Sequence, residues 1–174
     1  MDVLLQYSPL ISSVMPLIII VLTGLWVNHR LEKLKSRFQL DHAIIKKRAD
    51  IYAEIQDDIN TIYSYIKRVG KWKEFTPKSV LEAKRNVDQK FHTTQPYWSK
   101  ETIYKYHSLM SACFETYRGN GIDAGIIAEI DKYMCLPNWQ DDFASDFVDG
   151  YNMSVLENAY SEFMDSLSKD FGIA

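Results

Sequence analysis

The sequence predicts an all-α protein with a single N-terminal transmembrane helix, a long helical neck and a compact cytosolic helical domain of about five helices. Three observations carry this prediction. A long uncharged apolar run lies near the N-terminus, a seven-residue apolar repeat follows it, and the rest of the chain shows helix caps and helix breaks. No alternating apolar and polar stretch is long enough to predict a β-strand.

These features divide the chain into four expected parts. They are an external N-terminus at residues 1–9, the transmembrane helix at 10–27, a juxtamembrane helical neck at 28–51 and the cytosolic α-helical domain at 52–174. Without its first two parts the chain keeps roughly 145 residues, which is enough to bury one hydrophobic core.

The run from Leu10 to Val27 is the predicted anchor. As a helix it would span about 27 Å, close to the hydrocarbon thickness of a bilayer. Tyr7 and Trp26 stand near its ends, where aromatic rings prefer the membrane interface. Only Asp2 precedes it as a charged residue, whereas the downstream flank is basic, with His29, Arg30, Lys33, Lys35 and Arg37. Because cationic flanks stay cytoplasmic, we expect the N-terminus outside the inner (cytoplasmic) membrane and the domain in the cytosol.

Two other interpretations of this run are a cleaved signal peptide and a buried helix of a soluble protein. A signal peptide needs a positive N-terminal region and a cleavage site of small residues. Here the N-terminal region is acidic and the run ends in Trp26-Val27. The membrane anchor is therefore the favoured interpretation.

From the membrane edge onward, apolar residues repeat every seven positions. The repeat comprises Val27, Leu31, Leu34, Phe38, Ile45, Tyr52, Ile55, Ile59, Ile62, Ile66 and Val69, with Asp41 and Arg48 as exceptions. Neither Gly nor Pro occurs between Leu25 and Val69, and Gly70 is a natural stop. We therefore expect one helix to continue from the anchor to about residue 69.

The repeat has two explanations, and we expect each to hold for one part. Near the membrane, helices of several chains would pair as a parallel coiled coil, and from about Tyr52 the stripe would pack in the chain's own domain. The expected oligomerisation residues are Leu31, Leu34, Phe38, Asp41, Ile45 and Arg48. Asp41 and Arg48 would either set the register or lie in a solvated part of the helix.

Caps and breaks predict the later helices. Thr76-Pro77 begins a helix to about Thr93, Ser99 caps a helix whose apolar stripe reaches Tyr117, Asp123 opens a helix to about Met134, Asn138 caps a helix at Trp139–Val148, and a last helix covers residues 153–171.

Charge is unevenly distributed. Residues 28–50 carry seven Lys or Arg against three Asp or Glu, whereas residues 120–174 carry two against eleven. Such an acidic C-terminal region argues against binding of a DNA or RNA duplex, because carboxylates repel phosphates. Cys113 and Cys135 lack metal-ligand spacing, sit on apolar stretches and are expected to be buried free thiols in a reducing compartment.

Catalytic, phosphate-binding and metal-binding motifs are absent from the sequence. We therefore expect no enzyme activity, no cofactor and no metal site, with an active site assembled from scattered residues as the alternative. The carboxylates of Asp141, Asp142, Asp146 and Asp149 are expected to form a solvated acidic face rather than a cation site.

One cluster, termed here the basic–aromatic cluster, combines cations with flat rings, which suit an anionic, stackable ligand such as a nucleotide. Its candidate ligand-binding residues are Lys67, Arg68, Lys71, Trp72, Lys73, Lys84, Arg85 and Trp98. Two other interpretations stay open. One is a solvated turn with its tryptophan in the core, and the other is contact with the acidic C-terminal helices of a neighbouring chain.

A single span, a helical neck and a compact domain form a layout that resembles small single-span bacterial membrane proteins of anti-phage or toxicity loci. These include the membrane-anchored cyclic-oligonucleotide effectors of type III CRISPR systems. The resemblance implies antiviral defence by a domain that oligomerises, binds a messenger and perturbs its anchors. It lies in the layout alone, so no functional residue carries over.

We expect a non-enzymatic effector or signalling subunit that self-associates and couples its cytosolic domain to the lipid bilayer. One alternative is a ligand-gated membrane effector that senses an anionic nucleotide messenger. Another is a passive membrane tether for a soluble partner protein.

Overall fold

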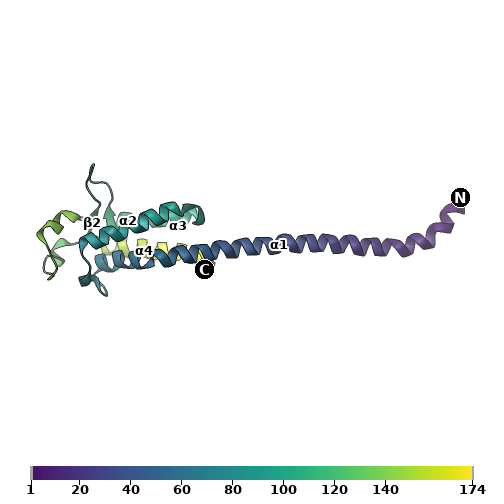
Figure 1. Cartoon of the computed structure of the whole chain (residues 1–174), viewed down its shortest axis with the longest axis horizontal. Helices are drawn as coiled ribbons and strands as arrows, with labels where there is room; N and C mark the ends of the chain where they lie inside the picture. Colours follow the sequence, from purple (N-terminus) through teal and green to yellow (C-terminus); the bar gives the residue numbers. More distant parts are fainter. Residues whose placement is uncertain (1, 174) are drawn as a thin grey trace. The chain divides into compact units, whose positions relative to one another are not determined.

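The computed structural model describes the backbone of residues 2–173 and the side chains of residues 19–173. This part of the chain is mostly helical, as predicted. Its α-helices are α1 (Asp2–Lys67), α2 (Pro77–Thr93), α3 (Lys100–Cys113) and α4 (Met153–Asp170) (Figure 1). The chain divides into two compact units, Met1–Ile44 and Ile45–Ala174, and the second is called the compact unit below.

The first unit consists of the N-terminal part of α1. Between Ile19 and Val27 it exposes seven large apolar side chains, each at 45–65% of its surface. Over the stretch with described side chains, no helix combines the length and apolarity needed to cross a membrane. The side chains of residues 1–18, which include the predicted external N-terminus and the first half of the predicted span, lie outside that description.

The backbone of α1 is unbroken to Lys67, which confirms the prediction of one continuous helix. Its end differs from the expected glycine stop. Arg68 has a φ of 61° and is the left-handed residue that ends the helix. Its N–H donates to the carbonyl of Tyr65 at 3.2 Å, and the N–H of Val69 donates to that of Ser64 at 3.0 Å. These two bonds satisfy terminal carbonyls in the manner of a Schellman motif, with Gly70 two residues further on.

In the compact unit the last part of α1 forms a four-helix bundle with α2, α3 and α4 (Figure 1). Neighbouring helices are antiparallel, the usual arrangement for helices joined in chain order. The α1–α4 contact includes Tyr63 and Tyr160, whose rings stack at 3.8 Å. Between α2 and α3, the ring of Phe91 stacks on that of Tyr106 at 4.0 Å.

The face of α1 that enters this core is a stripe of isoleucines. Ile51, Ile55, Ile59, Ile62 and Ile66 are each at most 2% exposed. Full burial stabilises such a side chain by about 1.5–3 kcal/mol relative to an exposed one. The prediction that the repeat packs inside the chain's own domain from about Tyr52 onward is therefore confirmed.

The helix caps explain where α2, α3 and α4 begin. Thr76 and Ser79 form a reciprocal capping box at α2, with Pro77 as its first residue. The Ser99 side chain accepts the Thr102 N–H at α3, as predicted for that cap. At α4 the cap is Asn152. Substitution of such caps by Ala costs about 1 kcal/mol.

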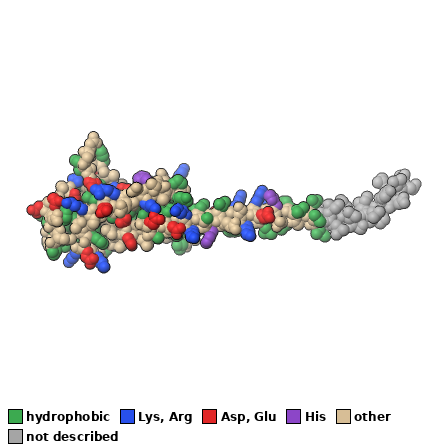
Figure 2. Space-filling view, viewed as in Figure 1, with side chains coloured by type: hydrophobic (Ala, Val, Ile, Leu, Met, Phe, Trp, Pro, Cys, Tyr) green, Lys and Arg blue, Asp and Glu red, His purple; other side chains and the backbone are tan. Residues whose placement is uncertain are grey.

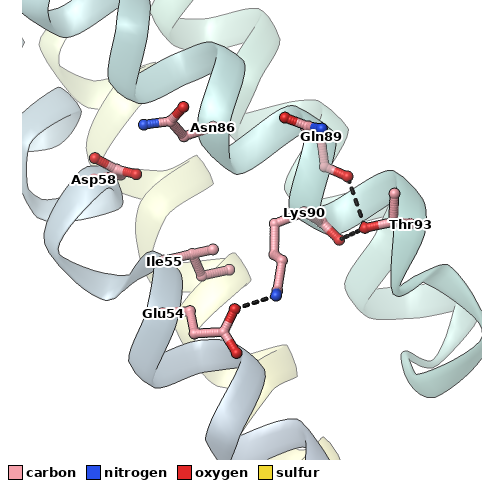
Figure 3. A pocket seen from close by; sticks show the side chains of 7 residues that line it. All are labelled: Glu54, Ile55, Asp58, Asn86, Gln89, Lys90 and Thr93. Carbon is pink, nitrogen blue, oxygen red and sulfur yellow. Dashed lines mark hydrogen bonds and ion pairs between the residues drawn. The ribbon is translucent and has the colours of Figure 1, made fainter.

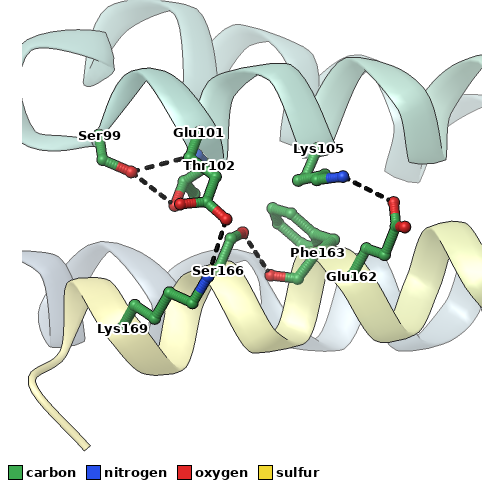
Figure 4. Close-up of polar contacts among 8 residues, drawn as sticks. All are labelled: Ser99, Glu101, Thr102, Lys105, Glu162, Phe163, Ser166 and Lys169. Atoms are coloured by element: carbon green, nitrogen blue, oxygen red, sulfur yellow. Dashed lines mark hydrogen bonds and ion pairs between the residues drawn. The ribbon is translucent and has the colours of Figure 1, made fainter. Parts of the chain in front are cut away.

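Helices α3 and α4 pack around a buried aromatic ring with an ion pair on each side (Figure 4). Phe163 of α4 is fully buried between them. Lys105 lies 2.8 Å from Glu162, and Lys169 lies 2.9 Å from Glu101. The order of these pairs along the two helices shows directly that α3 and α4 are antiparallel.

The segment between α3 and α4 corrects the all-helical prediction. It contains a sheet in the order β1 (Phe114–Glu115), β2 (Gly125–Ile127) and β3 (Phe147–Val148), in which β1 and β2 are antiparallel and β2 and β3 parallel. Short 3-10 helices, η3 (Ile130–Lys132) and η4 (Asp141–Asp146), accompany it. The helices predicted at 123–134 and 139–148 are wrong, and the helix predicted to reach Tyr117 ends at Cys113.

Local sequence accounts for these strands. Ile126 and Ile127 are β-branched and favour extended backbone, and Ile126 is fully buried. A Cβ at position 125 would lie 2.6 Å from the Val148 side chain, so Gly125 permits the close approach of β2 and β3. Strands of two or three residues are too short to show an alternating pattern, which is why the sequence did not reveal them.

Candidate functional site

Five residues of the basic–aromatic cluster lie together at the connection between α1 and α2. Lys67 ends α1 and Arg68 stands in the left-handed turn. Lys71, Trp72 and Lys73 follow in and next to the 3-10 helix η1 (Trp72–Glu74). The structure thus gathers this part of the predicted site at one end of the bundle.

The first two cations of this group are paired with carboxylates of the same chain. Lys67 Nζ lies 3.0 Å from Glu157 and donates a hydrogen bond to the Tyr63 hydroxyl at 3.1 Å. Arg68 Nη1 lies 2.6 Å from Glu129. Both carboxylates belong to the acidic C-terminal region. The charge asymmetry of the sequence is therefore partly satisfied by ion pairs within one chain.

Trp72 helps to cover the core. It is half-buried, and its ring lies edge-on at 5.5 Å from that of Tyr133, a fully buried residue. The Tyr133 hydroxyl donates to the carbonyl of Tyr65 at 2.9 Å, and burial raises the pKa of Tyr133 above its ordinary value. Lys73 Nζ lies 5.7 Å from the centre of the Trp72 ring, and Lys71 is exposed. Together these contacts make Trp72 part of the cover over Tyr133.

Lys84 and Arg85 lie on α2 and have different environments. Lys84 is buried, with its Nζ 2.5 Å from Asp88, and the other Asp88 oxygen accepts a hydrogen bond from the Tyr106 hydroxyl. Arg85 is exposed and pairs with Asp123. The Lys84 charge is thus neutralised inside the bundle.

Trp98 lies at the other end of the bundle. It is buried, and its ring stacks on that of Phe91 at 5.4 Å. The neighbouring Tyr97 carbonyl accepts a hydrogen bond from Arg48 Nε at 2.6 Å. Arg48 precedes Arg68 by about 30 Å along α1. The eight cluster residues therefore do not surround one site, and ligand binding by residues 67–73 stays a prediction.

The structure also contains a site that the sequence did not indicate, a polar groove of about 420 Å³ between α1 and α2 (Figure 3). Glu54 and Asp58 stand one turn apart on α1, opposite Asn86 and Lys90, which are one turn apart on α2. The full lining is Glu54, Ile55, Asp58, Asn86, Gln89, Lys90 and Thr93. Polar residues spaced by four on two successive helices were the only signal for it in the sequence.

The two groove carboxylates have opposite pKa shifts. A hydrogen bond from Lys90 lowers the pKa of Glu54. Burial raises the pKa of Asp58, against the opposing effect of a hydrogen bond from Asn86. Opposed shifts are what an acid–base pair needs, but the Glu54 carboxylate is already occupied by Lys90. The groove offers amide N–H and Lys90 donors together with carboxylate and amide acceptors, a mixed set that suits a small polar molecule.

The oligomerisation residues fall into two groups. Leu31, Leu34 and Phe38 are 49–70% exposed, and Asp41 is exposed as well. Figure 2 shows apolar and cationic side chains interleaved along this part of α1. Together with Val27, which is 45% exposed, these three apolar residues are called the neck stripe below. No described side chain of the first unit covers it.

Ile45 and Arg48 form the second group, and both are engaged within the compact unit. Ile45 is half-buried beside Gly172. Arg48 donates to the carbonyls of Tyr97 and Asp170, and its guanidinium lies 3.6 Å from the Asp170 carboxylate. Arg48 was a candidate to set the register between chains. Its guanidinium is instead bonded to groups of its own chain.

The remaining reactive groups are two free thiols. Cys113 is buried, as expected, and burial raises its pKa to about 12. Cys135 is exposed, so the expectation that both thiols are buried is wrong for it. In the part of the chain that the structure describes, no three His, Cys, Asp or Glu side chains are grouped as a metal ion would require.

No protein-family model matches the chain, and no curated protein or solved structure is significantly similar to it. Its function is therefore argued from its own residues.

Proposed function

We propose that the protein is a membrane-anchored, single-pass helical protein that self-associates and couples its cytosolic domain to the membrane as a non-enzymatic effector or signalling subunit. One observation carries the proposal. The apolar repeat of α1 is exposed in the neck stripe and buried from Ile55 to Ile66, on a helix with no break between them.

Support for the anchor comes from residues 10–27 and their flanks. The run has no charge, and its described part exposes seven large apolar side chains in nine residues. A contiguous exposed apolar surface of this kind marks contact with a membrane or a partner. The basic residues that follow favour an orientation with the domain in the cytosol, at the inner membrane.

Support for self-association comes from the neck stripe. Its side chains recur at the 4-3 spacing that lines one face of a two-stranded coiled coil. They are exposed, whereas the same repeat inside the compact unit is filled by the chain's own helices. Chains anchored in one membrane share an orientation, so parallel pairing is the arrangement that the anchor permits.

Support for coupling comes from the contacts of α1 beyond the neck. Its isoleucines form one wall of the core, and Arg48 ties it to the end of α4 and to the turn before α3. A change in how the necks pair would therefore act on a helix that is built into the domain. A signal would then act by shifting the equilibrium between two arrangements of the paired necks.

Site-directed crosslinking of the full chain in membranes tests the proposal. In a Cys135→Ser background, Leu34→Cys places a thiol on the neck stripe, and Ser36→Cys places one on the opposite side of the helix as the matched control. We expect oxidation to give a disulfide-linked dimer from the Leu34→Cys variant and little from the Ser36→Cys variant. The protein should resist alkaline carbonate extraction and dissolve in detergent.

Equal crosslinking of the two variants would contradict pairing through the neck stripe. Release of the protein by carbonate would contradict the anchor. The two parts of the proposal are thus tested separately in one preparation.

A further inference from the structure

We propose that anionic lipid headgroups strengthen pairing of the neck, because they neutralise the cations on both sides of the neck stripe. The inference rests on the proposed anchor and self-association and adds what controls them. The occupant of the stripe is a second copy of this chain, and the lipid acts on the flanks.

The cations occupy the positions that face a partner in a parallel coiled coil. With Leu31 and Leu34 on the seam, Arg30 and Arg37 flank it on one side, and Lys35 flanks it on the other. The structure shows these side chains exposed along the neck stripe. One shallow hollow of the neck is lined by Leu31, Leu34, Phe38, Lys35, Gln39 and His42, and a second by Arg30, Lys33, Leu34 and Arg37.

Pairing of two necks therefore brings like charges together. In a parallel coiled coil, the residue just before the first seam position of a heptad faces the residue five positions later on the other helix. Arg30 meets Lys35 of a second copy, and Arg37 meets His42 of a second copy. The Arg30–Lys35 contact, made twice in a symmetric pair, joins two cations, and neither contact contains a carboxylate, so the flanks oppose the pairing that the apolar seam favours.

The chain's own carboxylates are largely engaged elsewhere. Of the eleven acidic residues in positions 120–174, six pair with cations of the compact unit, namely Asp123, Asp142, Asp170, Glu129, Glu157 and Glu162. Among the described side chains, Arg30, Lys35 and Arg37 form no ion pair, and Arg30 instead lies over the Trp26 ring at 5.2 Å. The neck's own exposed carboxylates, Glu32 and Asp41, lie outside the two flank contacts, so an anion that neutralises those contacts comes from outside the chain.

Lipid headgroups are the anion within reach. Arg30 and Arg37 follow the predicted membrane boundary at Val27 by about 4.5 and 15 Å along the helix. The headgroup layer is about 5–8 Å deep, and charges act over a further 8 Å or so at physiological salt. An anionic leaflet attracts basic residues in this zone and lowers the repulsion between paired necks.

The test measures energy transfer between labelled copies of the full chain in vesicles. Dye is attached at Ser36→Cys, on the outer side of the helix, in the Cys135→Ser background. The vesicles contain phosphatidylcholine alone or phosphatidylcholine mixed with phosphatidylglycerol. We expect association to be about two- to fivefold stronger in the anionic vesicles, as the relief of the two symmetric Arg30–Lys35 contacts predicts.

Two variants assign the effect to the flanks. Lys35→Glu replaces the repulsive contact with Arg30 of a second copy by an attractive one, so its association should be high in both lipids. Lys33→Glu makes the same charge change off the seam and should keep the lipid dependence of the unmodified protein. Leu34→Asp should abolish energy transfer in both lipids.

The outcomes separate this inference from the proposal beneath it. Equal transfer in both lipids that Leu34→Asp abolishes would overturn the role of the headgroups and leave self-association intact. No transfer in any vesicle would remove self-association itself. If Lys33→Glu behaves like Lys35→Glu, or if inorganic phosphate added to phosphatidylcholine vesicles replaces phosphatidylglycerol, the assignment to headgroups acting on the seam flanks is wrong.

Discussion

The two halves of α1 carry the same apolar repeat in opposite surroundings. The neck stripe keeps 45–70% of each side chain exposed, whereas Ile55, Ile59, Ile62 and Ile66 are at most 2% exposed. The repeat alone cannot account for this difference. It specifies which face of a helix is to be covered and leaves open whether the cover comes from the same chain or from another.

The flanking charges differ between the halves as well. In the compact unit, cations beside the buried stripe meet carboxylates, as in the pair of Lys90 and Glu54 or of Lys67 and Glu157. In the neck, Arg30, Lys35 and Arg37 flank the stripe without such partners among the described side chains. Charge pairing thus distinguishes a face that the chain covers itself from one that no described side chain covers.

The largest expected effect is a difference in the free energy of unfolding between two side-chain truncations, one in each half of α1. Ile59→Ala should lower the free energy of unfolding by about 2–5 kcal/mol, because it leaves a cavity in a fully buried site. Leu34→Ala should change it by less than about 0.5 kcal/mol, since the side chain touches little within the chain. Urea unfolding of the full chain in detergent, followed by tryptophan fluorescence, measures both. A comparable loss in Leu34→Ala would show that the neck stripe is covered within the chain.

The second prediction concerns Arg48, near the point where the buried half of α1 begins. Arg48→Met should lower the free energy of unfolding by about 2 kcal/mol, because its hydrogen bonds to Tyr97 and Asp170 are charge-assisted and largely sheltered. The control is Lys78→Met, which removes the exposed pair of Lys78 with Asp142 and should have little effect. If the two variants lose stability equally, the Arg48 contacts do not hold α1 to α4.

A smaller effect concerns the irregular end of the compact unit. One carboxylate oxygen of Asp146 is buried without a hydrogen-bond partner, and burial raises the pKa of this group. A raised folded pKa means that the native state binds the proton more tightly than the unfolded state, so charged Asp146 destabilises the protein above that pKa. Asp146→Asn should therefore add about 0.5–1 kcal/mol at neutral pH.

The pH dependence of that gain is its control. As pH falls through the folded pKa of Asp146, the unmodified protein gains stability that the Asn variant already has, so the difference between the two should close. Thermal unfolding of both proteins across a pH series measures it. A difference that stays constant with pH would point to packing instead of charge.

The last prediction concerns cysteine reactivity, which tests whether the neck stripe affects the opening of the compact unit. Exposed Cys135 should react quickly with an aromatic disulfide reagent, whereas buried Cys113 should react only when the compact unit unfolds. Leu34→Asp should leave the Cys113 rate unchanged, since the neck stripe lies outside the core. Faster reaction of Cys113 in that variant would mean that the neck contributes to the closure of the domain.

Much of the helical architecture was predictable from the sequence. The repeat and the absence of breaks gave α1, and the caps at Thr76 and Ser99 gave α2 and α3, because both signals act within a few residues of the chain. The stop at Arg68 was missed, since a left-handed arginine has no signature comparable to glycine. Strands around Ile126 were missed because partners distant in sequence, such as Val148, define them.

The candidate site was less predictable. Trp72 and Trp98, which were expected to stack on a ligand, pack on or in the core instead. Arg68 and Lys67 pair with Glu129 and Glu157, which lie sixty or more positions away in the sequence. The polar groove requires the turns of α1 and α2 to face each other with Asp58 opposite Asn86. Composition revealed the cations and rings, and only the tertiary arrangement shows which of them are already in use.

The neighbouring positions of α1 and α4 have a consequence for the speed of folding. Arg48 bonds to a carbonyl 122 positions away, and Tyr52 contacts Phe171. Helical bundles generally fold fast because their contacts are local, and this one needs its first and last helices to meet. During synthesis the isoleucine face of α1 leaves the ribosome long before α4 exists to cover it. The nascent compact unit therefore passes through an interval with an uncovered apolar helix, in which its main hazard is aggregation.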